Sequence, residues 1–400
     1  MKILDITEFY SERGGGIRSH LTIRGHVLCQ LGHEHTVIAP GPRDEVVDLL
    51  ASGAPDGDRA PCKIAGGRGP RVVRMAGPAL PYDRTYHLLG RLDKIRSLVR
   101  AERPDVLEAH SPYLATAAVL ASGRSSARIR TAFWHTDHLG VYVEPAVSRL
   151  IGDRGAEVVV RPLWVGVRAL LAPFDATFVA GVAQERHLRD AGVRGVVHVP
   201  FGVDAKTFRP DRRSAVTRHE LTGGAPGPLL VGSGRFALEK RWDVVLDAFG
   251  QLRTRRPATL VLFGDGPERA RLERAAPPGV RFAGFERDRG KLATALASAD
   301  VVVHGGPYET FGLAIAEAAA SGTPVVVPDR GGAQESADPA SSETYRSLDA
   351  AACAAAIERI LDRDPAELRA GALGVAARVP TVEQHFARVV AVYDDLLRAC

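Results

Sequence analysis

The chain has 400 residues, of which 45% are hydrophobic and 25% are charged. This length exceeds the size at which one hydrophobic core usually keeps growing, so we expect two domains. The net charge of +5 suits a phosphate-bearing ligand or an anionic membrane surface. It is too small to indicate nucleic acid, and the basic-aromatic interleaving of single-strand binders is absent from the sequence.

The cysteines are scattered without a C-x-x-C spacing, at Cys29, Cys62, Cys353 and Cys400. We therefore expect neither a disulfide framework nor a zinc site, and a reducing cytoplasm is the simplest compartment. The first residues, MKILDITEFY, lack the apolar region of a signal peptide, and no apolar run approaches 18 residues. The sequence predicts no membrane span and leaves a peripheral contact with the inner membrane face open.

Short β-branched runs alternate with helix-length amphipathic stretches along most of the chain. The runs expected as strands in the first half are KILDI, HTVIA, DVLEA, IRTAFW, ATFVA and VVHVP. Those expected in the second half are PLLVGSG, ATLVLFG, VRFAGF, DVVVHG and TPVVVP. Near-continuous apolar strands separated by helices indicate parallel sheets covered on both faces. The predicted fold class is α/β, with two Rossmann-like doubly wound domains facing across a cleft.

The domain boundary is expected within VPFGVDAKTFRPDRR, where a strand ends and a charged connector begins. This gives an N-terminal domain of residues 1–203 and a C-terminal domain of residues 204–380. The last helix, 381–400, has no strand after it. Its apolar stripe consists of Val382, Phe386, Val389, Tyr393 and Leu396.

The stretch GGPYETFGLAIAEAAASGTPVV places a glycine loop between a strand and an alanine-rich helix. The backbone N–H groups of Gly312 and Leu313 are expected to open the first helical turn and, with the helix dipole, to form an anion site. Glu309 and Glu317 flank that site and would accept hydrogen bonds from sugar hydroxyls. Either glutamate alone is more simply a cap neighbour or a solvated helix residue; the pattern E-x-F-G-L-x-x-x-E is the specific signal.

A second loop, GSGRFALEKRWD, places two cations after a strand that ends near Gly234. Arg235 and Lys240 could clamp a diphosphate and stabilise it as it leaves. The loop is not a P-loop, because it lacks G-x-x-x-x-G-K-[ST]. Taken alone, a charged turn is the simpler explanation; combined with the first motif, the diphosphate clamp is favoured.

Three further loops follow predicted strands. In ERGGGIRSH, Gly15 and Gly16 either offer backbone N–H groups to a substrate or form a plain turn. In FGDGP, Asp265 and Gly266 either border a nucleotide or serve only the turn. In FWHTDH, His135 is expected to position sugar hydroxyls or an acceptor; a metal site is disfavoured because the spacing is wrong for a helical pair and no further ligands are evident nearby.

These motifs resemble the retaining, metal-independent glycosyltransferases of family 4, which have the GT-B fold. The matching elements are PFGVD, GSGR with the following lysine, FGDGP, ETFGLAIAE, ASGTPVV and GG with the following glutamate, in the family's order over about residues 198–340. The N-terminal GGG and HTDH fit less specifically. The resemblance implies that the last helix crosses back onto the N-terminal domain.

The resemblance also implies an acceptor-binding N-terminal domain and a C-terminal domain that holds a nucleoside-diphosphate sugar. Glu309 would bind the donor sugar, Glu317 the ribose, Arg235 and Lys240 the diphosphate, and His135 would lie close to the reacting centre. The catalytic candidates are His135, Arg235, Lys240 and Glu309. The donor-binding candidates are Gly15, Gly16, Gly234, Asp265, Gly266, Phe311, Gly312, Leu313 and Glu317. No metal ligand and no cofactor is assigned.

The expected reaction moves a hexosyl group from a UDP- or GDP-sugar to a hydroxyl acceptor, with mannosyl weakly favoured because HTDH is similar to a loop of bacterial mannosyltransferases. Asp137 as a covalent nucleophile is disfavoured. The alternatives are a nucleotide-sugar epimerase, a phosphorylase on the same fold and a catalytically silent nucleotide-sugar-binding partner; an NAD oxidoreductase is the weakest. The acceptor is a glycan, a small molecule or a lipid-linked molecule. The basic, leucine-containing segment 58–105 could contact an anionic membrane or be a solvated surface.

Overall fold

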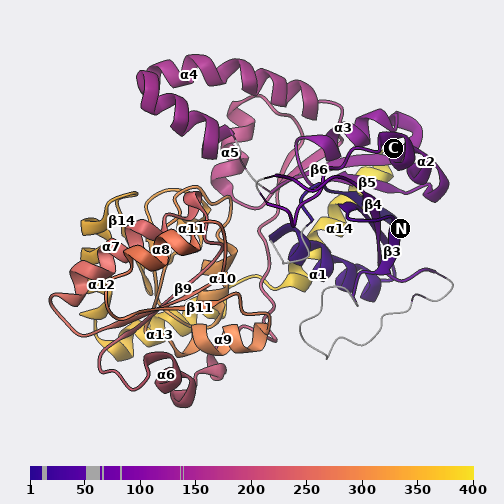
Figure 1. Cartoon of the computed structure of the whole chain (residues 1–400). Helices are drawn as coiled ribbons and strands as arrows, with labels where there is room; N and C mark the ends of the chain where they lie inside the picture. The colour runs from indigo at the N-terminus through magenta and orange to yellow at the C-terminus, as the bar shows by residue number, and fades with distance from the viewer. Residues whose placement is uncertain (11–15, 51–63, 65–66, 82, 136, 138) are drawn as a thin grey trace. The chain divides into compact units, whose positions relative to one another are not determined.

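The computed structural model describes residues 1–10, 16–50, 64, 67–81, 83–135, 137 and 139–400. The chain divides into two compact units (Figure 1). Unit 1 comprises Met1–Pro200 together with Val382–Cys400, and unit 2 comprises Phe201–Thr381. Both units are α/β, as the alternating strand and helix patterns predict.

Unit 1 contains an eight-stranded sheet of order β3-β4-β2-β1-β5-β6-β7-β8, parallel except for the antiparallel edge strand β3. Its central strands are almost entirely buried, because helices cover both faces of a parallel sheet. The strands are β1 (Lys2–Ile6), β2 (Glu34–Gly41), β3 (Glu45–Asp48), β4 (Arg71–Ala76), β5 (Val106–Ala109), β6 (Ile129–Trp134), β7 (Ala176–Val179) and β8 (Val196–His198). The α-helices are α1 (Gly16–Gln30), α2 (Leu92–Glu102), α3 (Leu114–Ala121), α4 (Glu144–Leu171), α5 (Val182–Asp190) and α14 (Val382–Ala399).

Unit 2 contains a parallel six-stranded sheet of order β11-β10-β9-β12-β13-β14. Helices α7, α8 and α12 form one contacting group and α6, α9, α10 and α13 another, so the sheet lies between two helical layers (Figure 1). The strands are β9 (Leu229–Ser233), β10 (Thr259–Phe263), β11 (Val280–Gly284), β12 (Val301–Val303), β13 (Val325–Pro328) and β14 (Ser342–Tyr345). The α-helices are α6 (Ala215–Thr222), α7 (Trp242–Arg253), α8 (Arg269–Ala275), α9 (Arg289–Ser298), α10 (Leu313–Ala320), α11 (Gly332–Glu335), α12 (Ala350–Leu361) and α13 (Pro365–Ala376).

All the strands expected from sequence are present, and three further strands, β3, β4 and β14, are additional. Two of these three lie at sheet edges, where one side of the backbone faces no neighbouring strand and polar residues are tolerated. In β4, Arg71 and Arg74 break the apolar run, so its sequence RVVRMA does not show the pattern of a buried parallel strand.

The segment that the sequence suggested as a membrane face packs its apolar side chains into unit 1. Leu89, Ile95 and Val99 are buried in the core, and Leu92 and Leu98 pack against it. The apolar stripe of α2 is therefore the inward face of an amphipathic helix, so these buried residues do not form a membrane contact. Leu88, which precedes the helix, is exposed.

The final helix, α14, belongs to unit 1 although it follows all of unit 2 in the chain. It contacts α1 and β6, and Val382, Phe386, Val389 and Tyr393 are buried, which accounts for its apolar stripe. Within the described parts of the chain, no helix combines the length and the apolar character needed to cross a bilayer. Cys29 is disulfide-bonded, which the scattered spacing of the cysteines did not predict; Cys353 and Cys400 are free.

Candidate active site

The loops that carry most of the predicted donor-site residues follow strands β9, β10 and β12 of unit 2. Strands β9 and β12 are neighbours at the centre of the sheet, with β10 continuing on one side and β13 on the other. This is the point where the strand order reverses, and ligands of open α/β sheets bind beside the carboxyl ends of strands at such a point. The topology therefore brings these loops together at the carboxyl ends of the strands of the unit 2 sheet.

The loops after β9 and β10 are held together by backbone contacts. The Phe236 N–H donates to the Asp265 carbonyl at 2.9 Å, and the Trp242 indole donates to the Arg235 carbonyl at 3.0 Å. A Cβ on Gly266 would lie 2.4 Å from the Phe236 carbonyl oxygen, so only glycine fits there. The Arg235 side chain is exposed at this rigid turn, as a side chain that reaches for a ligand needs to be.

Lys240 and Glu309 meet as an ion pair although they are separated by 69 positions in the chain. Lys240 ends the short helix η4 (Leu238–Lys240), whose backbone packs so closely on the loop after β12 that a Cβ on Gly305 would lie 2.8 Å from the Lys240 carbonyl. His304 Nε2 lies 3.1 Å from the same Glu309 oxygen. Burial alone would raise the pKa of Glu309, but the Lys240 ammonium and His304 outweigh it and hold that pKa well below its ordinary value.

The start of α10 is built around Gly312, which precedes the helix with φ +80°. A Cβ at Gly312 would lie 2.7 Å from the Ala333 Cα, so both the backbone angle and the space require glycine. The first helical hydrogen bonds run from Ile315 and Ala316 to the Gly312 carbonyl. The N–H groups of Gly312 and Leu313 therefore precede the intrahelical ladder at the positive end of the dipole, as predicted for an anion site.

Glu317 is buried inside α10 and forms an ion pair with Arg289, the first residue of α9. The Arg289 guanidinium lies over the Phe208 ring, 4.7 Å from its centroid. Burial raises the pKa of Glu317, and Arg289 opposes that rise. The simpler alternative, that Glu317 is a solvent-exposed helix residue, is therefore wrong.

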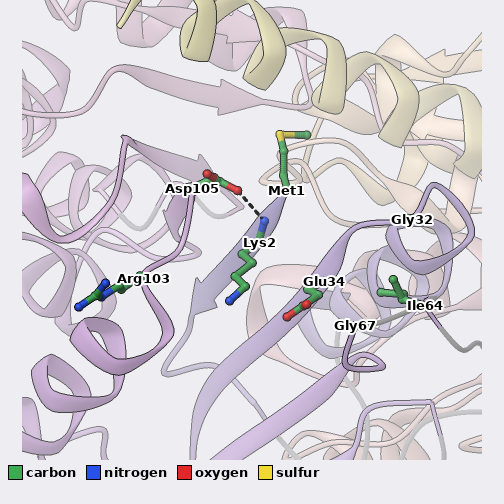
Figure 2. A pocket seen from close by; sticks show the side chains of 8 residues that line it. All are labelled: Met1, Lys2, Gly32, Glu34, Ile64, Gly67, Arg103 and Asp105. Carbon is green, nitrogen blue, oxygen red and sulfur yellow. Dashed lines mark hydrogen bonds between the residues drawn. The ribbon is translucent and has the colours of Figure 1, made fainter.

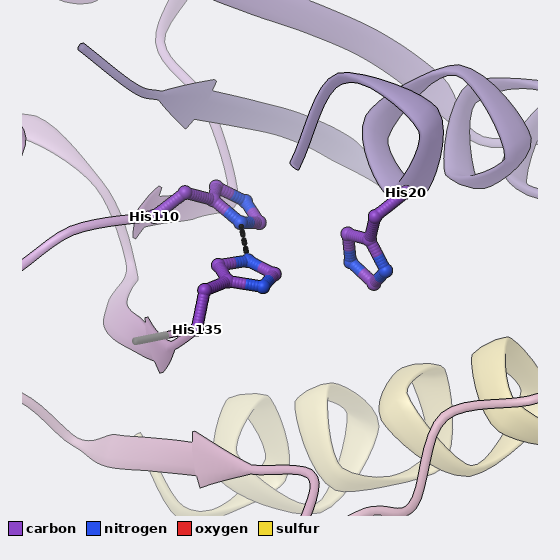
Figure 3. Close-up of side chains that lie close together, drawn as sticks. All are labelled: His20, His110 and His135. Carbon is purple, nitrogen blue, oxygen red and sulfur yellow. Dashed lines mark hydrogen bonds between the residues drawn. The ribbon is translucent and has the colours of Figure 1, made fainter. Parts of the chain in front are cut away.

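In unit 1, His135 follows β6 and its Nε2 lies 2.8 Å from Nδ1 of His110, which follows β5 (Figure 3). His20, on α1, faces the same two imidazoles. The expectation that no further ligand residues lie near His135 is wrong. Asp137 is buried and accepts a hydrogen bond from the Gly140 N–H at 2.9 Å, which is the role of a turn-capping carboxylate.

Behind these histidines lies a buried charged network. Arg24 contacts Asp5 at 2.9 Å and Glu108 at 2.8 Å, with all three side chains fully buried. The Tyr393 hydroxyl donates to Glu108 at 2.6 Å and accepts from Arg24 at 2.8 Å, which ties α14 to β5. Each carboxylate thus has several partners, as a buried charge requires.

Comparison with known proteins gives the family. Residues 227–363 match the profile of the glycosyl transferases group 1, and residues 15–202 match that of the glycosyl transferase 4-like domain. A GDP-mannose-dependent alpha-(1-6)-phosphatidylinositol dimannoside mannosyltransferase of Mycobacterium tuberculosis (strain ATCC 25177 / H37Ra) is 35% identical over 332 residues, 82% of this chain and 79% of the relative. The chain belongs to the group 1 glycosyl transferases.

Two further similarities agree with this family. A GDP-mannose-dependent alpha-mannosyltransferase of Mycolicibacterium smegmatis is 30% identical over 383 residues, 94% of this chain and 92% of that protein. A sucrose-phosphate synthase from Thermosynechococcus elongatus has the same fold, with a TM-score of 0.76 at 20% identity over the full length of both chains. This group 1 glycosyl transferase is thus an enzyme of the GT-B fold that uses a nucleotide-sugar donor.

Not every predicted residue of this glycosyl transferase can be placed. Gly15 lies outside the described residues, and Gly16 is the first described residue of α1. Gly234, Asp265, Gly266, Phe311, Gly312 and Leu313 all lie in the strand-end loops of unit 2 or at the start of α10. Their roles in donor binding, like that of His135, stay predictions.

A separate pocket of about 420 Å³ lies in unit 1, at the amino-terminal ends of strands β1 and β2 (Figure 2). Its lining includes Lys2 and Glu34, the first residues of β1 and β2, and the Lys2 N–H donates to Asp105 at 2.8 Å. Because ligands of this fold bind at the carboxyl ends of strands, we do not assign the donor to this pocket.

The sequence reasoning missed His304, Arg289 and His110. His304 lies in the strand-end motif DVVVHG and His110 directly follows DVLEA, so their positions after strands were the available signal. Arg289 lies after GFERD, and only its spatial proximity to Glu317 identifies it.

Proposed function

We propose that this glycosyl transferase transfers a mannosyl group from GDP-mannose to a hydroxyl of a mannosylated phosphatidylinositol lipid, with retention of configuration. The similarity to GDP-mannose-dependent relatives over most of the chain supports the donor, and the name of the first relative supports the acceptor. The observation that carries the chemistry is the Lys240–Glu309 pair beside the start of α10.

The pair suggests how the site receives its donor. An arriving diphosphate competes with Glu309 for the Lys240 ammonium, and Arg235 and the N–H groups of Gly312 and Leu313 add positive charge. Once Lys240 turns to the diphosphate, the Glu309 carboxylate accepts hydrogen bonds from the sugar hydroxyls. Because its pKa is held low, Glu309 is ionised and acts as an acceptor over the physiological pH range.

In the transfer step, the bond between the sugar anomeric carbon and the diphosphate oxygen breaks while the acceptor hydroxyl bonds to that carbon from the same face. The hydroxyl proton passes to the departing diphosphate. Lys240, Arg235 and the helix dipole stabilise the negative charge that develops on the leaving group. Glu317, buried beside Arg289, is the candidate acceptor of hydrogen bonds from the ribose.

The proposed lipid acceptor requires contact with a membrane, and α4 provides the surface for it. After a kink at Gly152, apolar side chains of this helix are exposed, with Val158 at 72% and Val165 at 50% exposure. Arg154, Arg161 and Arg168 follow at seven-residue spacing and form an exposed basic line beside them. A helix that combines exposed apolar and basic side chains is typical of an interface with anionic lipid.

The donor is tested by thermal stabilisation of the protein with GDP-mannose, UDP-glucose and UDP-N-acetylglucosamine. We expect GDP-mannose to raise the melting temperature most. Transfer is tested with labelled GDP-mannose and phosphatidylinositol mannoside in vesicles, using Glu34→Ala at the remote pocket as a control. Stabilisation by the UDP-sugars alone would contradict the donor. Conversion of the donor without acceptor would indicate an epimerase, and binding without transfer or hydrolysis a silent partner.

The membrane surface is tested by cosedimentation with vesicles containing phosphatidylinositol. Val158→Asp should reduce the bound fraction severalfold, because it places a charge on the apolar face of α4. Val216→Asp is the matched control, since Val216 on α6 of unit 2 is 68% exposed. Equal losses in both variants would contradict a specific role of α4.

A further inference from the structure

The structure assigns a binding site for a divalent transition-metal ion to His20, His110 and His135 of unit 1. The site goes beyond the proposed transfer reaction, which uses no metal. One ligand nitrogen from each of the three imidazoles lies within 4.8 Å of the other two. The side chains come from α1, from the end of β5 and from the end of β6, and Figure 3 shows them converging on one gap.

The separation of two of these nitrogens fits an ion after a small adjustment. His110 Nδ1 and His135 Nε2 are 2.8 Å apart and share a hydrogen bond. Two imidazole ligands at about 2.0–2.1 Å from a tetrahedral zinc ion are separated by roughly 3.3 Å. The ion therefore lies beside the line that joins the two nitrogens and replaces their hydrogen bond. The proton of that bond moves to the other nitrogen of its own ring, and the two rings move apart by a few tenths of an ångström.

The surroundings of His110 are those of a metal ligand. Its second nitrogen, Nε2, lies 3.3 Å from both Asp5 and Glu108. Two carboxylates on that side favour a proton on Nε2, which leaves the Nδ1 lone pair directed toward His135 and His20. Metal-bound histidines regularly donate their other N–H to a carboxylate, because this fixes the tautomer and raises the basicity of the ligand.

The carboxylates themselves are not the ligands. Asp5 is engaged by Arg24 at 2.9 Å and by His35 at 2.7 Å. Glu108 is engaged by Arg24, by the Thr131 hydroxyl at 2.7 Å and by Tyr393 at 2.6 Å. An ion among Asp5, Glu108 and His110 would have to displace these bonds in a fully buried network, whereas the three-histidine gap needs no such displacement.

The three imidazole side chains select the class of ion. Nitrogen ligands suit Zn²⁺, Cu²⁺, Ni²⁺ and Co²⁺, whereas Mg²⁺ and Ca²⁺ prefer oxygen. With three protein ligands, a fourth position stays open to water or another small ligand. His135 is only partly buried, so an ion can reach the gap from its side.

The test is a titration of metal-free, full-length protein with Co²⁺ and Zn²⁺, followed by calorimetry and by the visible absorption of Co²⁺. We expect one tightly bound ion, and at least tenfold weaker binding in His20→Ala and in His135→Ala. His33→Ala is the matched control, because His33 lies 3.2 Å from the N-terminal amine and forms the competing nitrogen pair. Loss of binding in His33→Ala, or unchanged binding in the other two variants, overturns the site.

A measurement on the unchanged protein avoids variants that fail to fold. Cu²⁺ bound at one equivalent should show electron paramagnetic resonance couplings to imidazole nitrogens, and the His33→Ala protein should show the same spectrum. Coordination by oxygen alone, or absence of saturable binding of any of these ions, overturns the assignment. None of these readouts depends on sugar transfer, so failure of the metal site is distinguishable from failure of the proposed function.

Discussion

The two units each contain a group of charged side chains, but the groups differ in how completely their members are paired. In unit 1, Asp5, Arg24 and Glu108 are fully buried and each has several partners. In unit 2, Lys240 and Glu309 are partly exposed at strand ends. A buried network in which every charge has its partners holds secondary-structure elements together. In an ion pair that water can reach, one side chain can leave the other and bind a ligand instead. The comparison separates a stabilising function from a binding function.

The largest effect is expected from Arg24→Ala. The substitution leaves Asp5 and Glu108 as buried carboxylates without their cation, which costs about 3–5 kcal/mol. We expect a large fall in melting temperature or insoluble protein. Arg398→Ala is the control, since its pair with Asp395 is exposed, and it should change stability by less than about 0.5 kcal/mol. Equal melting temperatures for both variants would contradict the contrast between the units.

Lys240→Ala should affect catalysis far more than stability. Loss of one cation that stabilises the leaving diphosphate should reduce kcat by about 10²–10³-fold. The free energy of unfolding should change by no more than about 1 kcal/mol, because the pair is partly exposed. Kinetics with GDP-mannose and a melting curve measure the two effects, with Glu34→Ala as the control. A variant that loses stability but keeps its turnover would contradict the assignment of Lys240 to the leaving diphosphate.

Gly312→Ala tests the geometry at the start of α10. The new Cβ meets the Ala333 Cα, and the backbone angle disfavours any side chain, so we expect about 1–3 kcal/mol of destabilisation. Relaxation of the loop also displaces the N–H groups of the anion site, so affinity for GDP should fall. Gly250→Ala is the control, because a Cβ there makes only ordinary contacts at 3.6 Å. Undiminished GDP affinity, measured by calorimetry, would show that these N–H groups do not bind the nucleotide.

The smallest predicted effect is the pH dependence of the stability that Glu309 contributes. Because the pKa of Glu309 is lower in the folded protein than its ordinary value of 4.5, its ionised form stabilises unit 2 above about pH 4.5. That contribution is lost as pH falls further, toward the folded-state pKa. The melting temperature of the wild type should exceed that of Glu309→Gln by about 2–4 °C or less at pH 7, and the difference should shrink below pH 4.5. A difference independent of pH would contradict the ion pair.

Most of the fold was predictable from sequence because many strands contain short apolar runs, such as VVV in DVVVHG and LVLF in ATLVLFG, between helix-length stretches. The strands that escaped prediction, β3, β4 and β14, contain charged or hydroxyl side chains. Whether they form a strand depends on the adjacent strand of the sheet, and their own local sequence does not identify that strand.

The candidate site was predictable only in part for the same reason. Glu309, Lys240 and Gly312 belong to compact motifs next to strands. Arg289 and Glu317 are 28 positions apart in the chain. Arg24 is 84 positions from Glu108 and 369 positions from Tyr393. Pairs so distant in the chain follow from the completed topology, and an arginine within a helix gives no local sign of its partner.

The place of α14 has a consequence for how the protein is made. Tyr393 completes the bonds of Glu108 from a position 285 residues later in the chain. During synthesis, the uninterrupted segment Phe201–Thr381 leaves the ribosome before α14 does. The second unit can therefore fold while the first still lacks its last helix, and closing the first unit requires a loop that spans the whole of the second. The ribosome must therefore have released α14 before the buried carboxylates of the first unit gain their full set of partners.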